Sequence, residues 1–166
     1  MLKRATYAVV ASAATELAAN LSVRGQHRAR ARKLRGPSPP QLEAALSDVN
    51  QLLSGERSPT TPIEVLAVYC WVHEQLYGCL PIELIGETKS VRTTRMAALA
   101  RIRYVATRHF NGSFVPFIDF LAWSAGRERA RQQRKPGEEW RVGWRLQFSD
   151  GFLTDWQVAR KKGRRG

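Results

Sequence analysis

The chain has 166 residues, of which 43% are hydrophobic, so it is long enough and apolar enough to build a core and is not intrinsically disordered as a whole. Its 27 Lys and Arg residues against 14 Asp and Glu give a formal net charge of +13, which opposes compaction and is typical of chains with a polyanionic partner. No apolar run approaches the ~18 residues that a membrane span needs. The candidate polyanions are DNA, RNA or an anionic membrane surface, and we expect DNA or RNA as the partner and no membrane.

Residues 1–36 are predicted to form an N-terminal helix followed by a basic arm. The Ala/Val-rich start has the form of a signal peptide, with a small-x-small site at Ala11–Ala13. The apolar run before that site is short and helix-forming residues continue beyond it, so we interpret residues 5–20 as a helix. Residues 21–36 contain no acid, and residues 28–32 read Arg-Ala-Arg-Ala-Arg, a pattern typical of an arm that is solvated or lies on a polyanion.

Residues 37–135 are predicted to form a helical core, because capping signals divide them clearly. Ser38 caps a first helix that Gly55 ends. The sequence Thr61-Pro62-Ile63-Glu64 is a capping box with proline at the first helical position, and it predicts a central helix that Gly78 closes. A single helical turn is expected near Pro81.

A long helix is predicted from about Lys89 to His109 or Phe110, with Asn111-Gly112 as its end. Its apolar residues form one stripe, and arginines lie on both flanks of that stripe. Long arginines beside a packed interface are common, so these side chains are not assigned to the binding surface.

The next predicted helix begins at Ser113 with a dense aromatic segment, Phe114–Trp123, and becomes basic after Gly126. Its arginines at i, i+4 and i+7 share one face, which is a spacing suited to tracking phosphates, although Glu128 can pair with them locally. We list these arginines as Arg127, Arg131 and Arg134.

Residues 136–166 are predicted to form an aromatic β-hairpin and a basic tail. Apolar residues alternate on both sides of Ser149-Asp150-Gly151, and a three-residue loop there keeps them on one face. This register predicts a Trp144–Trp156 cross-strand pair and a left-handed Gly151. The alternating residues are Trp140, Val142, Trp144, Leu146 and Phe148, then Phe152, Thr154, Trp156 and Val158.

The sequence contains no pattern that points to catalysis, a metal or a cofactor. Cys70 and Cys79 are expected to be reduced, and with His73 they form only a weak zinc constellation that lacks a fourth ligand. Carboxylates are scattered, and phosphate-cradling glycine motifs are absent. We therefore expect no enzyme activity, no catalytic residue, no metal and no cofactor.

Two fragments, together under a dozen residues, resemble the small DNA-packaging (terminase) subunits of tailed phages. They are Lys33-Leu34-Arg35-Gly36 before prolines, and Leu66-Ala67-Val68-Tyr69-Cys70 inside a capped helix. The resemblance implies a DNA-packaging role, but the predicted hairpin has no place in that pattern.

The sequence thus predicts a mainly α protein of about five helices with a C-terminal β-hairpin, a basic internal arm and a basic C-terminal tail. The expected function is non-enzymatic nucleic-acid binding through the phosphate backbone, with a phage-type DNA-packaging or nucleoprotein accessory factor as its specific form. The residues expected to contact nucleic acid are Arg24, Arg28, Arg30, Arg32, Lys33, Arg35, Arg127, Arg131, Arg134, Lys135, Arg141, Arg145, Arg160, Lys161, Lys162, Arg164 and Arg165.

One alternative is a structural or assembly protein of a virion or ribonucleoprotein, in which the aromatic helix and the hairpin form subunit interfaces. The two roles can coexist, so a homo-oligomer or a larger nucleoprotein assembly is a further expected partner, in the cytoplasm or in a virion. An amphipathic membrane-surface binder is disfavoured, because the basic runs lack an adjoining aliphatic face.

Overall fold

The structure is a computed structural model that describes residues 39–138 and 141–163. All regular structure in these two ranges is helical: α2 (Pro39–Ser47), α3 (Val49–Ser54), α4 (Pro62–Tyr77), α5 (Lys89–Phe110), α6 (Pro116–Arg134), α7 (Trp144–Gln147) and α8 (Asp150–Gly163). Five of these helices have nine or more residues, which confirms a mainly α protein for this part of the chain. The predicted N-terminal helix, the basic arm and Trp140 lie outside the described residues.

Three helix ends occur where the capping residues predict them, whereas α6 begins at Pro116 with Val115, and not the predicted Ser113, at its N-cap. The Glu64 carboxylate accepts a hydrogen bond from the Thr61 backbone N–H at 2.9 Å, which is one half of the predicted capping box at the start of α4. Gly78 ends α4 with φ 70°, and Asn111 ends α5 with φ 52°. These left-handed positions favour Gly and Asn, so local chemistry alone fixes both ends.

The first predicted helix of the core is divided in two. Asp48 separates α2 from α3, and the Arg57 guanidinium holds its carboxylate together with that of Glu64. The Ser47 hydroxyl donates a hydrogen bond to the Glu43 carbonyl at 3.0 Å, a contact that bends helices. Two short polar residues in succession therefore interrupt a helix whose apolar spacing is otherwise continuous.

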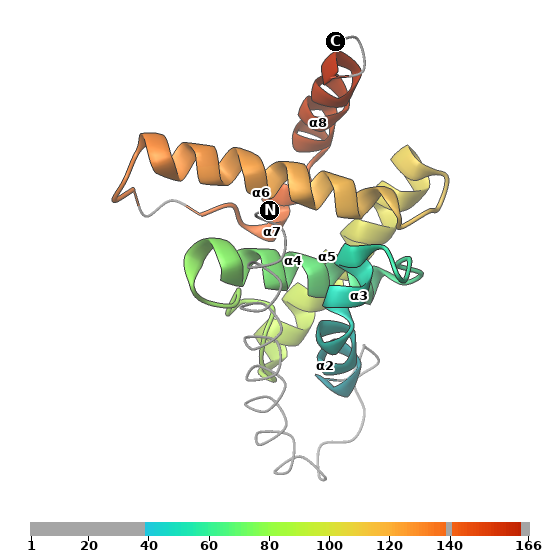
Figure 1. Cartoon of the computed structure of the whole chain (residues 1–166). Coiled ribbons are helices and arrows are strands. Elements are labelled where there is room, and N and C mark those ends of the chain that lie inside the picture. The colour runs from blue at the N-terminus through green and yellow to red at the C-terminus, as the bar shows by residue number, and fades with distance from the viewer. Residues whose placement is uncertain (1–38, 139–140, 164–166) are drawn as a thin grey trace.

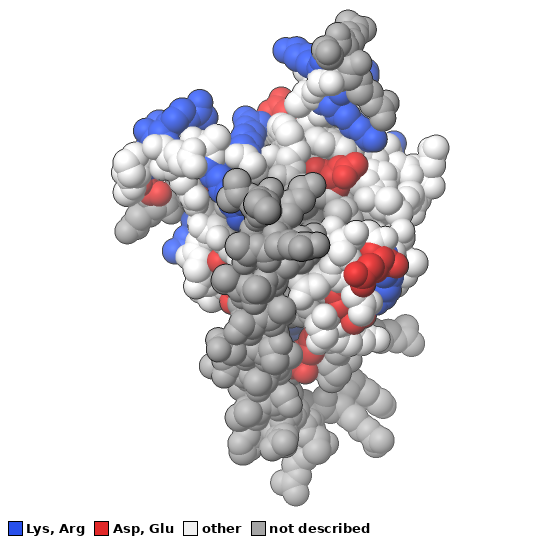
Figure 2. Space-filling view, in the orientation of Figure 1, with Lys and Arg blue, Asp and Glu red and all other residues white. Residues whose placement is uncertain are grey.

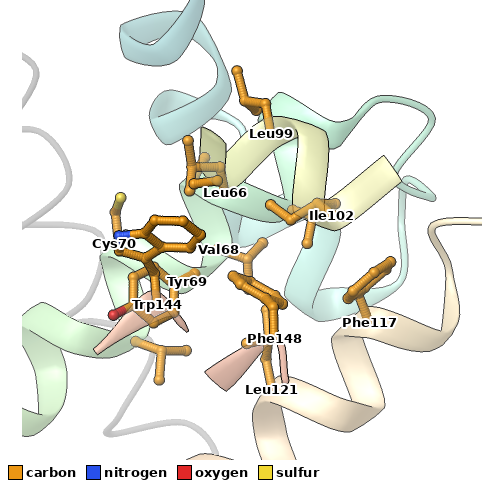
Figure 3. Close-up of a cluster of buried hydrophobic side chains, with 14 of the residues drawn as sticks. Leu66, Val68, Tyr69, Cys70, Leu99, Ile102, Phe117, Leu121, Trp144 and Phe148 are labelled. Atoms are coloured by element: carbon orange, nitrogen blue, oxygen red, sulfur yellow. The ribbon is translucent and has the colours of Figure 1, made fainter. Parts of the chain in front are cut away.

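Helix α4 lies at the centre of the fold and contacts α2, α3, α5 and α6 (Figure 1). Six successive α4 residues, Val65–Cys70, are at most 3% exposed, as expected for a helix that is covered on every side. Figure 3 shows side chains of α5, α6 and the C-terminal segment that meet around it, among them Ile102, Phe117 and Phe148. This single cluster is the hydrophobic core of the described chain.

The predicted β-hairpin is wrong, because its described residues form α7 and α8. Ser149 acts as the N-cap of α8: its hydroxyl accepts from the Phe152 N–H at 3.3 Å and its carbonyl from the Leu153 N–H at 3.2 Å. Gly151 lies inside the first turn of α8 and is not among the positive-φ residues. The Ser-Asp-Gly sequence is thus a helix start and not a hairpin loop.

The predicted Trp144–Trp156 pair is also wrong. Trp156 packs against Phe110 and Phe120, with ring centroids 5.8 and 5.6 Å away, so α8 docks on α5 and α6. Leu153, which strict alternation would turn outward, is fully buried, while Val158 is 46% exposed. The side chains follow a helical period and not a period of two.

Candidate nucleic-acid interface

Basic residues are concentrated in the second half of the chain. Residues 39–87 contain seven Asp and Glu and one basic residue, Arg57, whereas residues 88–163 contain 16 Lys and Arg against six acids. Figure 2 shows Lys and Arg on the outer end of α8 and around the C-terminal end of α6, with acids over the body and also beside both of these basic regions. A surface with such a surplus attracts polyanions before contact.

The predicted arginine face of α6 exists. Arg127, Arg131 and Arg134 line one pocket of about 190 Å³, together with Ser124, Val142 and Phe152 from α6, the segment before α7 and α8. The pocket therefore brings together three of the predicted site residues, and their common face follows from helical spacing alone.

Acids partly neutralise this arginine face. The Arg127 guanidinium lies 2.9 Å from the Asp155 carboxylate, and Lys135 lies 3.7 Å from Glu138. Arg131 pairs with Glu128 at 2.6 Å and also with Glu138. Because Glu128 is only 3% exposed, Arg131 compensates a buried charge, which gives it a structural role.

The segment that follows α6 is held on α4 by two tyrosines. The Tyr69 hydroxyl donates to the Val142 carbonyl at 3.1 Å, and the Val142 N–H donates to the Tyr77 hydroxyl at 2.9 Å. Burial raises the pKa of Tyr77 to about 12, and a hydrogen bond to Glu128 contributes to that rise. We call this arrangement the tyrosine clamp; it fixes the backbone on which the neighbouring Arg141 is carried.

Three predicted arginines in the described part of the C-terminal segment lie over aromatic rings. Arg141 lies 5.6 Å from the Tyr77 ring centre and donates to the Cys79 Sγ at 3.0 Å. Arg145 lies 4.9 Å from the Trp144 ring centre, and Arg160 lies 5.4 Å from that of Trp156. Each guanidinium stays at the surface while its stem covers apolar area, so it remains accessible to an anion.

The last turn of α8 carries three consecutive cations of the predicted set. Arg160, Lys161 and Lys162 are exposed, and none of them pairs with an acid among residues 39–138 and 141–163. The helix extends away from the body (Figure 1), so these side chains can approach a partner without steric hindrance. We call these three residues the α8 tip.

Sequence reasoning left α5 out of the site, although this helix has six Lys and Arg residues and no acid. Arg101 and Arg108 flank the exposed ring of Tyr104, at 4.7 and 5.7 Å from its centre. Arg101 also donates to the Phe148 carbonyl at 2.8 Å and pairs with Asp150 at 3.2 Å. The absence of acids over 22 residues was the signal that could have identified this helix.

The remaining predicted site residues lie outside the described chain: Arg24, Arg28, Arg30, Arg32, Lys33, Arg35, Arg164 and Arg165. The aromatic helix Phe114–Trp123 is mostly used internally, because Phe117 and Phe120 are fully buried. Less of its aromatic surface is therefore open to a sister subunit than the assembly alternative assumes.

Burial and hydrogen bonds account for the three residues of the weak zinc constellation, Cys70, His73 and Cys79. His73 donates from Nδ1 to the Cys79 carbonyl at 2.7 Å, and burial lowers its pKa. Cys70 is buried, burial raises the pKa of its thiol, and both cysteines are free thiols. No three His, Cys, Asp or Glu side chains come together as a metal site within the described ranges.

No family model, curated protein or solved structure matches this chain. The described helices include none that is both long enough and apolar enough to cross a membrane.

Proposed function

We propose that this protein is a non-enzymatic nucleic-acid-binding protein that holds the phosphate backbone, of the kind that serves DNA packaging or another nucleoprotein. The supporting observation is the α8 tip: three exposed cations at the end of a projecting helix, without an acidic partner in the described chain. Lys and Arg so placed release counterions when they meet phosphates, and this release drives association.

The arginines of α6 and of the C-terminal segment extend this surface. Arg134 and Arg145 are exposed and have no acidic partner among the described residues, while Arg127 is half-exposed beside Asp155. Aromatic rings under several guanidinium groups hold them in place without neutralising their charge. A nucleic-acid backbone that runs from α6 towards α8 would meet successive cations along its length.

The test is the salt dependence of binding to a random duplex. About six neutralised phosphates give a slope near −5 for the logarithm of the binding constant against that of salt concentration. Replacing the three residues of the α8 tip with alanine should reduce the magnitude of that slope by about 2–3, since each phosphate contact contributes about 0.9. Their side chains are exposed, so the thermal midpoint should change little.

The control variant is Lys89→Ala with Arg92→Ala. These residues lie at the start of α5, whereas the end of α5 lies beside α8. This variant removes two positive charges, against three in the α8 tip, and should change the slope by less than about 1. Binding that is undetectable at low salt, or independent of salt in the wild type, contradicts the proposal. Equal effects of the two variants would show that the α8 tip has no special part in it.

A further inference from the structure

A groove of about 540 Å³ lies where the end of α5 and the start of α6 meet α8. This volume is in the range of pockets that hold small organic groups. The residues that matter here are Phe110, Asn111, Trp156, Gln157, Arg160 and Lys161. We call it the α5–α8 groove.

The apolar wall of the groove is fixed in place. Phe110 packs edge-on against Trp156, with centroids 5.8 Å apart, and against Phe117, with centroids 5.0 Å apart. Trp156 is 4% exposed and Phe117 is fully buried, so both rings behind Phe110 belong to the core. A wall of this kind offers a planar group an apolar contact at little ordering cost.

Two carboxamides face the same space. Asn111 is held at the C-cap of α5, where its backbone N–H bonds the Ala106 carbonyl, and Gln157 lies on α8. Neither side chain makes a hydrogen bond to the parts of the chain that the structure describes. A carboxamide carries a donor and an acceptor side by side, which matches the hydrogen-bonding edge of a nucleobase.

The charge at the groove is positive. Arg160 and Lys161 line it, and no Asp or Glu does so among the described residues. The two acids of α8 are engaged elsewhere: Asp150 pairs with His109 at 3.1 Å and Arg101 at 3.2 Å, and Asp155 pairs with Arg127 at 2.9 Å. The groove therefore combines an apolar wall, free amides and cations within one cavity.

We infer that the α5–α8 groove holds one unpaired nucleobase of a single strand, with Arg160 and Lys161 on the adjoining phosphate. This inference rests on the proposed function and adds the class of nucleic acid that it prefers. A base in a duplex has its hydrogen-bonding edge paired and its faces stacked, so it cannot enter without being flipped out. The protein accordingly prefers single strands that carry bases over duplexes of equal length.

The experiment compares three labelled probes by fluorescence anisotropy at one salt concentration: a single strand, the same strand with abasic sites, and the duplex. The wild type should bind the base-bearing strand about tenfold more tightly than the abasic strand, since the stacking of one base on an aromatic side chain contributes enough binding free energy for that ratio. Asn111→Gly with Gln157→Ala should reduce the ratio to below about threefold and leave duplex binding unchanged. Glycine suits the positive φ of position 111, and alanine suits a helix, so this variant is expected to fold.

Gln51→Ala is the matched control, since Gln51 is an exposed amide on α3, and it should keep the full tenfold ratio. Equal wild-type affinity for base-bearing and abasic strands overturns the inference without any variant, while salt-dependent duplex binding still supports the proposed function. If the wild type binds none of the three probes, both this inference and the proposed function are overturned. A double variant that keeps the tenfold ratio shows that the base is bound elsewhere and overturns the assignment to this groove.

Discussion

The tyrosine clamp leads to a quantitative prediction for Tyr69→Phe. This substitution keeps the ring, which packs 5.6 Å from the Phe148 centroid, and removes only the hydroxyl that donates to the Val142 carbonyl. Tyr69 is 3% exposed and Val142 is 5% exposed, so water cannot replace the lost donor without local opening. An unsatisfied buried acceptor costs about 1–2 kcal/mol, which lowers the thermal midpoint of a domain of this size by about 2–8 °C.

Circular dichroism with urea and thermal unfolding measures this loss. Tyr104→Phe is the matched control, because Tyr104 is 41% exposed and its hydroxyl accepts from Arg108 at the surface, where water can substitute. The control should remain within about 0.5 kcal/mol of the wild type. If the two phenylalanine variants have the same stability, the clamp does not hold the segment before α7 and the reasoning is refuted.

Two further predictions concern α8 and α4. Gly151→Ala should raise the free energy of unfolding by about 0.5 kcal/mol in a urea titration, since Gly151 lies in a helical turn with nothing within 4 Å of an added Cβ; a hairpin loop with a left-handed glycine would be destabilised by the same change. Burial lowers the pKa of His73, so its contribution is present above pH 6.5 and is lost as pH falls through the folded pKa; stability measured from pH 7 to 5 should fall more steeply in the wild type than in His73→Gln, and parallel curves would contradict this.

The core helices were predictable from sequence because each of their ends depends on a few neighbouring residues. The Thr61–Glu64 capping box, Gly78 and Asn111 fix helix ends through bonds within one turn, and the structure confirms all three. The break at Asp48 was missed because the apolar spacing continues across it. Local signals that compete within a few residues are harder to rank than those that agree.

The C-terminal segment was mispredicted because its residues satisfy two patterns. Phe152 and Trp156 are four apart, so they share a face both in a strand and in a helix. Leu153 decides between them, since only a helix buries it together with Trp156. Ser149 likewise serves either a loop or an N-cap, and tertiary packing on α5 and α6 selects the second.

The shared face of the α6 arginines could be predicted, but their partners could be predicted only in part. The Glu128 contact with Arg131 is local, and the sequence indicated it. The Arg127–Asp155 pair joins residues 28 apart and depends on the docking of α8, which the hairpin prediction excluded. The α5–α8 groove could not be predicted from the sequence either, because it also depends on the docking of α8.

The uneven distribution of acids and bases gives this protein a direction as well as a charge. In the described part of the chain, Figure 1 places α2 and α8 at opposite ends, and residues 39–87 are acid-rich whereas residues 88–163 are basic. In the field of a polyanion such a molecule experiences a torque and turns before it touches.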